Sequence, residues 1–226
     1  MSAAEPERPS AFAMLGVIHG DPTGEALLGD RLESLRPGVI TLEFSPYGLE
    51  FRRSRGKALK ERACEMVEEM KQEGLPVDEE ALASLLSYID LPQEYAVASD
   101  YCRRHGIPLF LIDVDRFSSR RLSRMGELLA RENLVRLLAG PGYDGLLREK
   151  ALARLYFEKG VRAFSYTDEM RSRDRHMSRR ISALMQTHRP SLLAHVCGWQ
   201  HLSDPFALYA GLSPGKVFIH EQARRI

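Results

Sequence analysis

Four short and nearly continuous apolar runs constrain the fold of this chain more than any other feature. They lie at residues 11–18, 38–44, 107–114 and 191–197, and residues 216–219 form a weaker fifth run. Runs without polar alternation are typical of strands buried on both faces, as in a parallel sheet covered by helices. A buried helical segment is the alternative for each run, but the lengths favour strands.

Longer stretches with helical spacing separate these runs. They are predicted at residues 23–34, 49–73, 79–89, 93–105, 118–138, 144–159 and 167–188, and glycine or proline stands near most of their ends. The order predicts an α/β fold, in which a mostly parallel central sheet is flanked by helices and a helical insertion lies between strands 2 and 3. No linker rich in proline, glycine and serine divides the chain. We therefore expect a flexible N-terminus at residues 1–10 and a single domain at residues 11–226.

Composition argues against several classes of protein. The net charge of +1 gives no global attraction to nucleic acid or to membranes. No apolar run reaches the roughly 20 residues of a transmembrane helix, and residues 1–10 lack the pattern of a secretory signal. The three cysteines, Cys64, Cys102 and Cys197, are scattered and odd in number. Free buried thiols in a reducing, cytoplasmic compartment are the simplest explanation.

Each of the four main runs ends in polar residues that can bind ligands or react. These are His19 after the first run, Glu43 in the second, Asp113, Asp115 and Arg116 at the third, and Gln200 and His201 after the fourth. Ligands of open α/β sheets bind at the carboxyl ends of the strands, so we expect these groups to form a site. A carboxylate such as Glu43 in an apolar run is costly to bury without a partner. His195, inside the fourth run, could be a ligand but is better explained as a core residue.

Imidazole and carboxylate together suit a divalent metal ion. His19, His201 and Glu43 would form a two-histidine, one-carboxylate set for manganese, cobalt or zinc, with positions left for water. A metal ion held in this way lowers the pKa of bound water and polarises a carbonyl group. Each histidine follows a glycine by three residues, and glycine allows a tight turn or a close approach. A single Gly-x-x-His is nevertheless a weak signal, because a lone histidine after a strand is more often structural.

The helix predicted at residues 167–188 places charged residues on its apolar face. Met170, Met177, Ile181 and Leu184 define that face, and Arg173 and Asp174 fall within it. The charged pair is either a buried structural salt bridge or an arginine that positions a ligand and is fixed by a carboxylate. The five arginines of residues 171–180 are more typical of a solvated helix face than of a nucleic-acid site.

Five segments, in order along nearly the whole chain, resemble the TraB/Tiki family, which belongs to a superfamily with erythromycin esterase-like and ChaN-like proteins. They read GVIHGDPTGE, RPGVITLEFS, Glu94 followed by IPLFLIDVDR, DEMRSRDRHMSRRI and AHVCGWQHL. The first and last resemble the opening and closing Gly-x-x-His motifs of the family. The family commonly has Asp-Arg directly after the third strand, where this chain has Asp113, Val114, Asp115 and Arg116.

The resemblance implies a metal-dependent hydrolase, peptidase-like or esterase-like, that acts on a small-molecule or peptide substrate. His19 and His201 would be metal ligands, and Glu43 would be a ligand or general base. The other residues it implies are Asp115, Arg116 and Arg173 as catalytic residues, and Glu94, Asp174 and Gln200 as substrate-binding residues. The alternative is a non-catalytic protein that binds a metal, haem or a peptide in the same pocket. The membrane segment usual in TraB and Tiki chains is not found in this sequence, and a homo-oligomer remains open.

Overall fold

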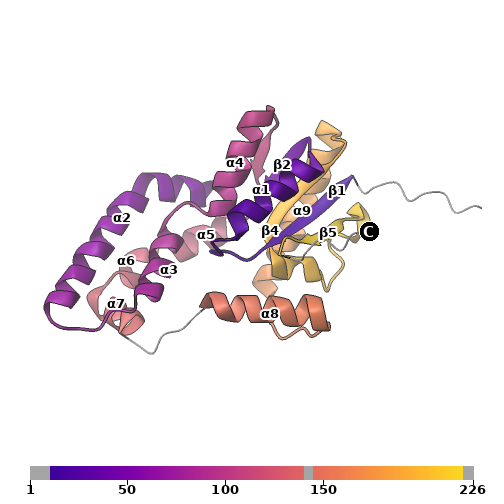
Figure 1. The fold of residues 1–226 in the computed structure, drawn as a ribbon. Helices are drawn as coiled ribbons and strands as arrows, with labels where there is room; N and C mark the ends of the chain where they lie inside the picture. The colour runs from indigo at the N-terminus through magenta and orange to yellow at the C-terminus, as the bar shows by residue number, and fades with distance from the viewer. Residues whose placement is uncertain (1–10, 140–144, 221–226) are drawn as a thin grey trace, which may run out of the picture.

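The computed structural model describes residues 11–139 and 145–220, and within them it shows an α/β fold built on a five-stranded, all-parallel sheet (Figure 1). The strands are β1 (Phe12–Val17), β2 (Val39–Leu42), β3 (Leu109–Leu111), β4 (Leu193–Gly198) and β5 (Gly215–Phe218). Their order across the sheet is β3-β2-β4-β1-β5. The predicted parallel sheet is confirmed, and the weak fifth run is its edge strand. Residues 1–10, predicted to be flexible, lie outside the described residues.

Helices cover both faces of the sheet and form the predicted insertion. The insertion between β2 and β3 consists of α2 (Pro46–Gln72), α3 (Glu79–Ile89) and α4 (Gln93–His105). The others are α1 (Gly24–Leu35), α5 (Asp115–Leu122), α6 (Met125–Leu128), α7 (Arg131–Leu138), α8 (Gly145–Lys159) and α9 (Asp168–His188), with short 3-10 helices η1 (Trp199–Ser203) and η2 (Ala210–Leu212). None of the described helices is both long and apolar enough to cross a bilayer.

Alternate residues of the central strands face opposite helical layers. In β1, Phe12 and Met14 pack in the cluster that contains Met177 of α9, whereas Leu15 packs with Leu28 of α1 on the other face. Both faces of the sheet are therefore dry, which explains why the strands lack polar alternation. The site described below lies just beyond the carboxyl ends of these strands, between the two helical layers.

A helical arm projects from the sheet and has its own apolar core, formed by α2, α3, α5, α6 and α7 (Figure 1). The prediction of one helix over residues 118–138 is wrong, because the chain breaks twice to form α5, α6 and α7. Because of the breaks, Leu122, Met125 and Leu134 all pack in one apolar cluster with residues of α2 and α3. The breaks themselves, at residues 123–124 and 129–130, contain no glycine or proline, and Gly126 within α6 is the one weak local signal in this stretch.

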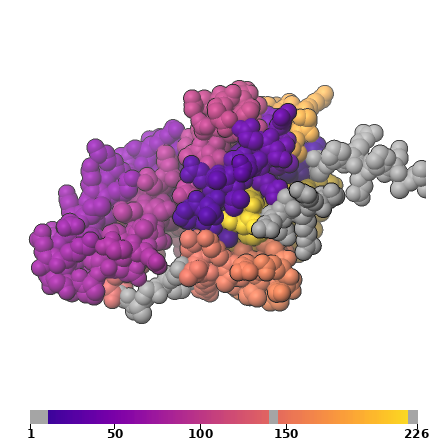
Figure 2. Space-filling model, viewed as in Figure 1, coloured from indigo at the N-terminus to yellow at the C-terminus, as the bar shows by residue number. Residues whose placement is uncertain are grey.

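The arm also explains the environment of one cysteine. All three cysteines are free, and Cys102 and Cys197 are buried as predicted. Cys64 is exposed, so the expectation of burial is wrong there, because α2 projects from the body and presents one side to solvent. In the space-filling view, this arm extends beyond the body, and α8, in orange, packs below the indigo N-terminal segments (Figure 2).

His195 is a core residue, as its position in β4 suggests. Its side chain is 0% exposed, and Nδ1 lies 3.0 Å from Oγ1 of Thr41, its neighbour across β2. Within the described residues, Nε2 has no hydrogen-bond partner. Burial lowers the pKa of His195 to about 4. The ring is therefore neutral in the folded protein at neutral pH.

We expect His195 to make the fold sensitive to acid. Since its pKa is lowered on folding, the unfolded chain binds the extra proton, and stability falls as the pH drops from about 6.5 to about 4. Between pH 7 and pH 4.5, the wild type should lose about 2–3 kcal/mol more free energy of unfolding than His195→Gln. Urea denaturation at both pH values measures this difference. Exposed His176→Gln, the control, should behave like the wild type, and equal losses in wild type and His195→Gln would contradict the expectation.

Candidate active site

The carboxyl ends of four neighbouring strands meet at one edge of the sheet. His19 follows β1, Glu43 follows β2, Asp113 follows β3, and His201 lies in η1 after β4. The order β3-β2-β4-β1 makes these ends adjacent, although the two histidines stand near opposite ends of the chain. Parallel strands lie roughly 4.8 Å apart, so side chains beyond their ends come within contact distance.

Glu43 is the centre of the resulting cluster. Its Oε1 lies 2.5 Å from Nη2 of Arg173 and 3.1 Å from Nε2 of His201, and its Oε2 accepts the backbone N–H of Gly198 at 2.7 Å. Burial raises the pKa of Glu43, but the charges of His201 and Arg173 outweigh it and hold the pKa well below its ordinary value. Glu43 is thus an ionised carboxylate whose two oxygens both accept hydrogen bonds from the protein.

His201 is held on the α9 side of the sheet. Its Nδ1 lies 2.6 Å from Oδ1 of Asp174 and its Nε2 lies 3.1 Å from Glu43, so both ring nitrogens face carboxylates. Burial lowers the pKa of His201, but Glu43 and Asp174 together raise it to about 10. Asp174 also accepts hydrogen bonds from the hydroxyls of Tyr209, at 2.8 Å, and Tyr166. His201 is therefore a buried imidazolium that anchors Glu43.

His19 is held from the opposite layer by α4. Its Nδ1 lies 2.9 Å from Oε1 of Glu94, which is buried in the first turn of α4, while the His19 side chain is 58% exposed. The protein around the ring displaces part of its water and so lowers the pKa of His19, but the charges of Glu94 and then Glu43 outweigh this effect and raise the pKa to about 9, although water screens the exposed part of the ring. Within the described residues, Nε2 makes no hydrogen bond. This arrangement leaves one ring nitrogen available to a ligand.

Arg173 ties two strand ends together. Its Nε and Nη2 lie 2.9 and 2.7 Å from the two carboxylate oxygens of Asp113, and Nη2 also contacts Glu43. The adjacent Asp174 instead binds His201. Of the two alternatives left open by the sequence, Arg173 is in a buried salt bridge, but with Asp113 and Glu43 rather than with Asp174. A bidentate guanidinium fixes the orientation of the carboxylates it binds.

The two glycines that precede the histidines have different roles. A Cβ on Gly16 would lie 2.5 Å from Cδ1 of Leu202 and 3.0 Å from Cα of Trp199, so this glycine allows η1 to pack against β1. A Cβ on Gly198 would lie 3.0 Å from Nε2 of His19 and 3.6 Å from Oε2 of Glu43. Gly198 therefore leaves open the space that His19 and Glu43 share.

Gly198→Ala should disturb this space without disturbing the backbone, because the φ of Gly198 is −56°, which alanine adopts freely. The new methyl group would push the His19 ring away from Glu43. We expect a loss of roughly 10- to 100-fold in kcat/KM for any reaction at this site. Gly24→Ala, where the added methyl group meets no atom within 4 Å, is the matched control. Equal activity of the two variants would contradict the expectation.

Three predicted site residues make their contacts elsewhere. Asp115 begins α5, and its Oδ1 accepts the backbone N–H of Tyr47 at 2.8 Å, in the first turn of α2. Arg116 lies over the ring of Phe117 at 4.8 Å. The amide of Gln200 lies 3.4 Å from Oε2 of Glu149 in α8. The catalytic roles predicted for Asp115 and Arg116 therefore gain no support, since Asp113 is the aspartate that binds Arg173.

Asp113 was expected at the site, although the resemblance gave the catalytic role to Asp115, and the two tyrosines Tyr166 and Tyr209 are members of the cluster that the prediction missed. Asp113 has a signal in the sequence, since it is a carboxylate directly after an apolar run. Tyr166 and Tyr209 have none, because one precedes α9 in a loop and the other lies between the 3-10 helices. Glu94 and Asp174, predicted to contact substrate, are each bonded to one of the two histidines.

The residues predicted to hold a metal ion do not form an open donor set. Both oxygens of Glu43 accept hydrogen bonds from the protein, and both ring nitrogens of His201 face carboxylates. The guanidinium of Arg173 already provides, next to Glu43, the positive charge that a bound metal ion would provide. Within residues 11–139 and 145–220, no group of three histidine, cysteine, aspartate or glutamate side chains is arranged to hold a metal ion.

Comparisons of the chain with protein-family models, with curated proteins and with solved structures found no match. The fold and the site therefore carry the functional inference. Together they define an α/β protein with a buried network of charges at the strand ends and one exposed histidine above it.

Proposed function

We propose that the chain is a hydrolase of ester or amide bonds in which His19 activates water. The observation that carries this proposal is the asymmetric environment of the His19 ring. Nδ1 is bonded to the buried carboxylate of Glu94, while Nε2 is open and faces the space beside Gly198. A carboxylate that fixes one ring nitrogen and leaves the other free is the arrangement that a histidine general base requires.

His19 takes part in the reaction as a neutral ring. Nδ1–H then donates to Glu94, and the lone pair of Nε2 accepts a proton from water. The water oxygen forms a bond to the substrate carbonyl carbon, the bond from that carbon to the leaving oxygen or nitrogen breaks, and the proton on Nε2 passes to the leaving group. A water molecule held beside Gly198 would lie within reach of both Nε2 and Oε2 of Glu43.

Glu43 supports this step through its charge. An ionised Glu43 favours the imidazolium that forms when His19 accepts a proton. Arg173 and His201 hold Glu43 in place and keep it ionised. They are positioning residues, since their side chains are only 13% and 4% exposed and their nitrogens are bonded to the carboxylates of Glu43, Asp113 and Asp174.

The metal-dependent form of this activity, and the binding of a metal, haem or a peptide without turnover, stay predictions from the sequence. One assay separates them. Purified protein is incubated with 4-nitrophenyl esters and with peptide 4-nitroanilides, either with a chelator or with added manganese, cobalt or zinc. The proposal predicts release of nitrophenol or nitroaniline that survives the chelator. Turnover that requires an added metal ion would support the metal-dependent form instead, and no turnover under any condition would leave only the binding alternatives.

A further inference from the structure

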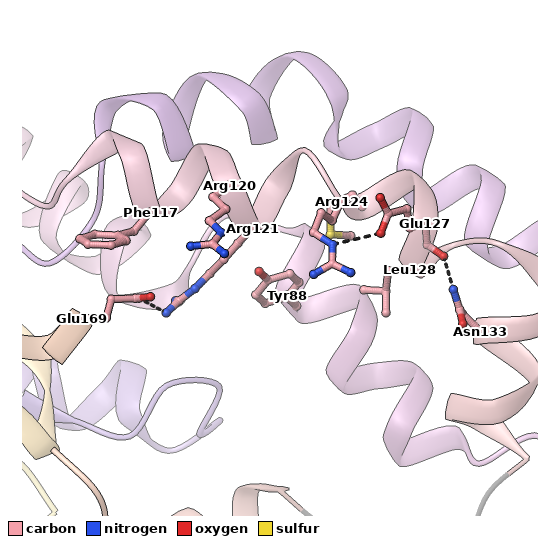
Figure 3. Close-up of a pocket in the computed structure, with 10 residues that line it drawn as sticks. Tyr88, Phe117, Arg120, Arg121, Arg124, Glu127, Leu128, Asn133 and Glu169 are labelled. Carbon is pink, nitrogen blue, oxygen red and sulfur yellow. Dashed lines mark hydrogen bonds and ion pairs between the residues drawn. The ribbon is translucent and has the colours of Figure 1, made fainter. Parts of the chain in front are cut away.

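A groove of about 410 Å³ lies between the helical arm and the start of α9, outside the cluster described above (Figure 3). Three arginines of α5 and the segment that follows it, Arg120, Arg121 and Arg124, line the groove together with the rings of Tyr88 and Phe117. A cavity of this size accommodates a small organic molecule. The mixture of guanidinium and aromatic groups indicates a ligand that is both charged and apolar.

The charges of the groove do not balance. Arg121 is paired with Glu169, and Nε of Arg124 lies 3.0 Å from Oε2 of Glu127, as Figure 3 shows. The guanidinium of Arg120 has no acidic partner among residues 11–139 and 145–220. Each glutamate of the groove is already engaged by an arginine, so an excess positive charge faces the cavity. An oxyanion is the complement of this charge, because the guanidinium fork matches carboxylate and phosphate geometry.

The groove is connected to the candidate active site through α9. Glu169 precedes Arg173 by one helical turn, roughly 5–6 Å along the axis, so the groove begins next to the arginine that binds Asp113 at the β3 end. His19 lies at the β1 end, three strands away in the order β3-β2-β4-β1. Three strand spacings correspond to roughly 15 Å. A molecule that occupies the groove and also reaches His19 must therefore be extended.

We propose that this groove binds an oxyanion, either a carboxylate or a phosphate monoester, on an apolar or aromatic body, and that it anchors one end of an extended substrate. The anchoring role rests on the proposed hydrolase function, whereas binding of the anion does not. The apolar walls, which include Tyr88, Phe117 and Leu128, then contact the body of the ligand.

Calorimetric titration of the full chain with three matched ligands tests the binding. The ligands are 4-phenylbutyrate, 4-phenylbutyl phosphate and the neutral 4-phenylbutanol. We expect at least one anion to bind about tenfold more tightly than the alcohol, and the preferred anion identifies the headgroup. Arg120→Gln combined with Arg124→Gln should abolish the preference, and Arg154→Gln, an exposed position on α8, should keep it. Anion binding no tighter than alcohol binding, or an equal effect of Arg154→Gln, would overturn the proposal.

Hydrolysis then tests the anchoring role. The mono-4-nitrophenyl ester of dodecanedioic acid carries a distant carboxylate, and 4-nitrophenyl dodecanoate is its neutral match. We expect a lower KM for the anionic ester, and Arg120→Gln should raise that KM without changing kinetics on the neutral ester. If the anions bind but the two esters have equal KM values, anchoring fails and the proposed function stands. If neither ester is cleaved, the proposed function and the anchoring role fail together, and anion binding stands alone.

Discussion

Arg173→Met should lower the free energy of unfolding by about 3–5 kcal/mol, because it leaves the buried carboxylate of Asp113 without its cation and removes one of the two cations bonded to buried Glu43. Glu43 and Asp113 are only 5% and 6% exposed, and Arg173 bonds to both. Methionine has a similar length and is apolar, so the loss reports the charge rather than a cavity. Urea denaturation at pH 7 measures the change.

Two further variants make this prediction specific. Arg179→Met replaces an exposed arginine on the same helix and should change stability by less than about 0.5 kcal/mol. The double variant Arg173→Met with Asp113→Asn should be more stable than Arg173→Met alone, because it removes the charge of Asp113 that the single variant leaves unpaired. If the double variant is less stable than the single one, the buried charges are not the cause of the loss.

His19→Ala should have the largest effect on activity, a decrease of about 10²- to 10⁴-fold in kcat/KM on any ester or amide that the chain cleaves. Because the His19 side chain is 58% exposed, the fold should be retained, and the free energy of unfolding should fall by about 1–3 kcal/mol because buried Glu94 loses its partner. His176→Ala, an exposed position on α9, is the control and should retain full activity. If His19→Ala retained full activity, His19 would have no role in the reaction.

The pH dependence of kcat/KM also tests whether His19 is the base of the reaction. A base must be neutral to accept a proton, so activity should rise with pH through the pKa of His19, which Glu94 raises to about 9 against the effect of burial. In Glu94→Gln, the midpoint of this rise should move down towards 6.5, the ordinary value for histidine. The maximum rate should also fall, because glutamine does not stabilise the imidazolium.

Much of the fold was predictable because a strand that is buried on both faces has a nearly continuous apolar sequence. The runs at residues 11–18, 38–44, 107–114 and 191–197 are nearly continuous in apolar residues, and the sheet confirms that each contains a strand. The division of residues 118–138 into three helices was not predicted, since the breaks accompany packing against α2 and α3, and Gly126, the one glycine in this stretch, lies within α6 rather than at a break. Tertiary contacts override local propensity in such segments.

The candidate site was predictable in its location and less so in its contacts. The strand ends indicated His19, Glu43 and His201, and the topology brings them together. Which carboxylate binds which cation depends on the layer that each side chain faces, and a sequence does not state that layer. For this reason the sequence did not indicate that Asp113 rather than Asp115 binds Arg173, or that Glu94 is bonded to His19.

The pKa of the His19 ring, measured by nuclear magnetic resonance, tests the central arrangement most directly and needs no substrate. Histidine ring signals would be followed from pH 5 to pH 10, and the His19 signal would be assigned by its absence in His19→Ala. The Glu94–His19–Glu43 arrangement predicts a pKa clearly above 6.5, towards 9, that falls when Glu94 is replaced by glutamine. A pKa near 6.5 that does not respond to Glu94→Gln would contradict the account.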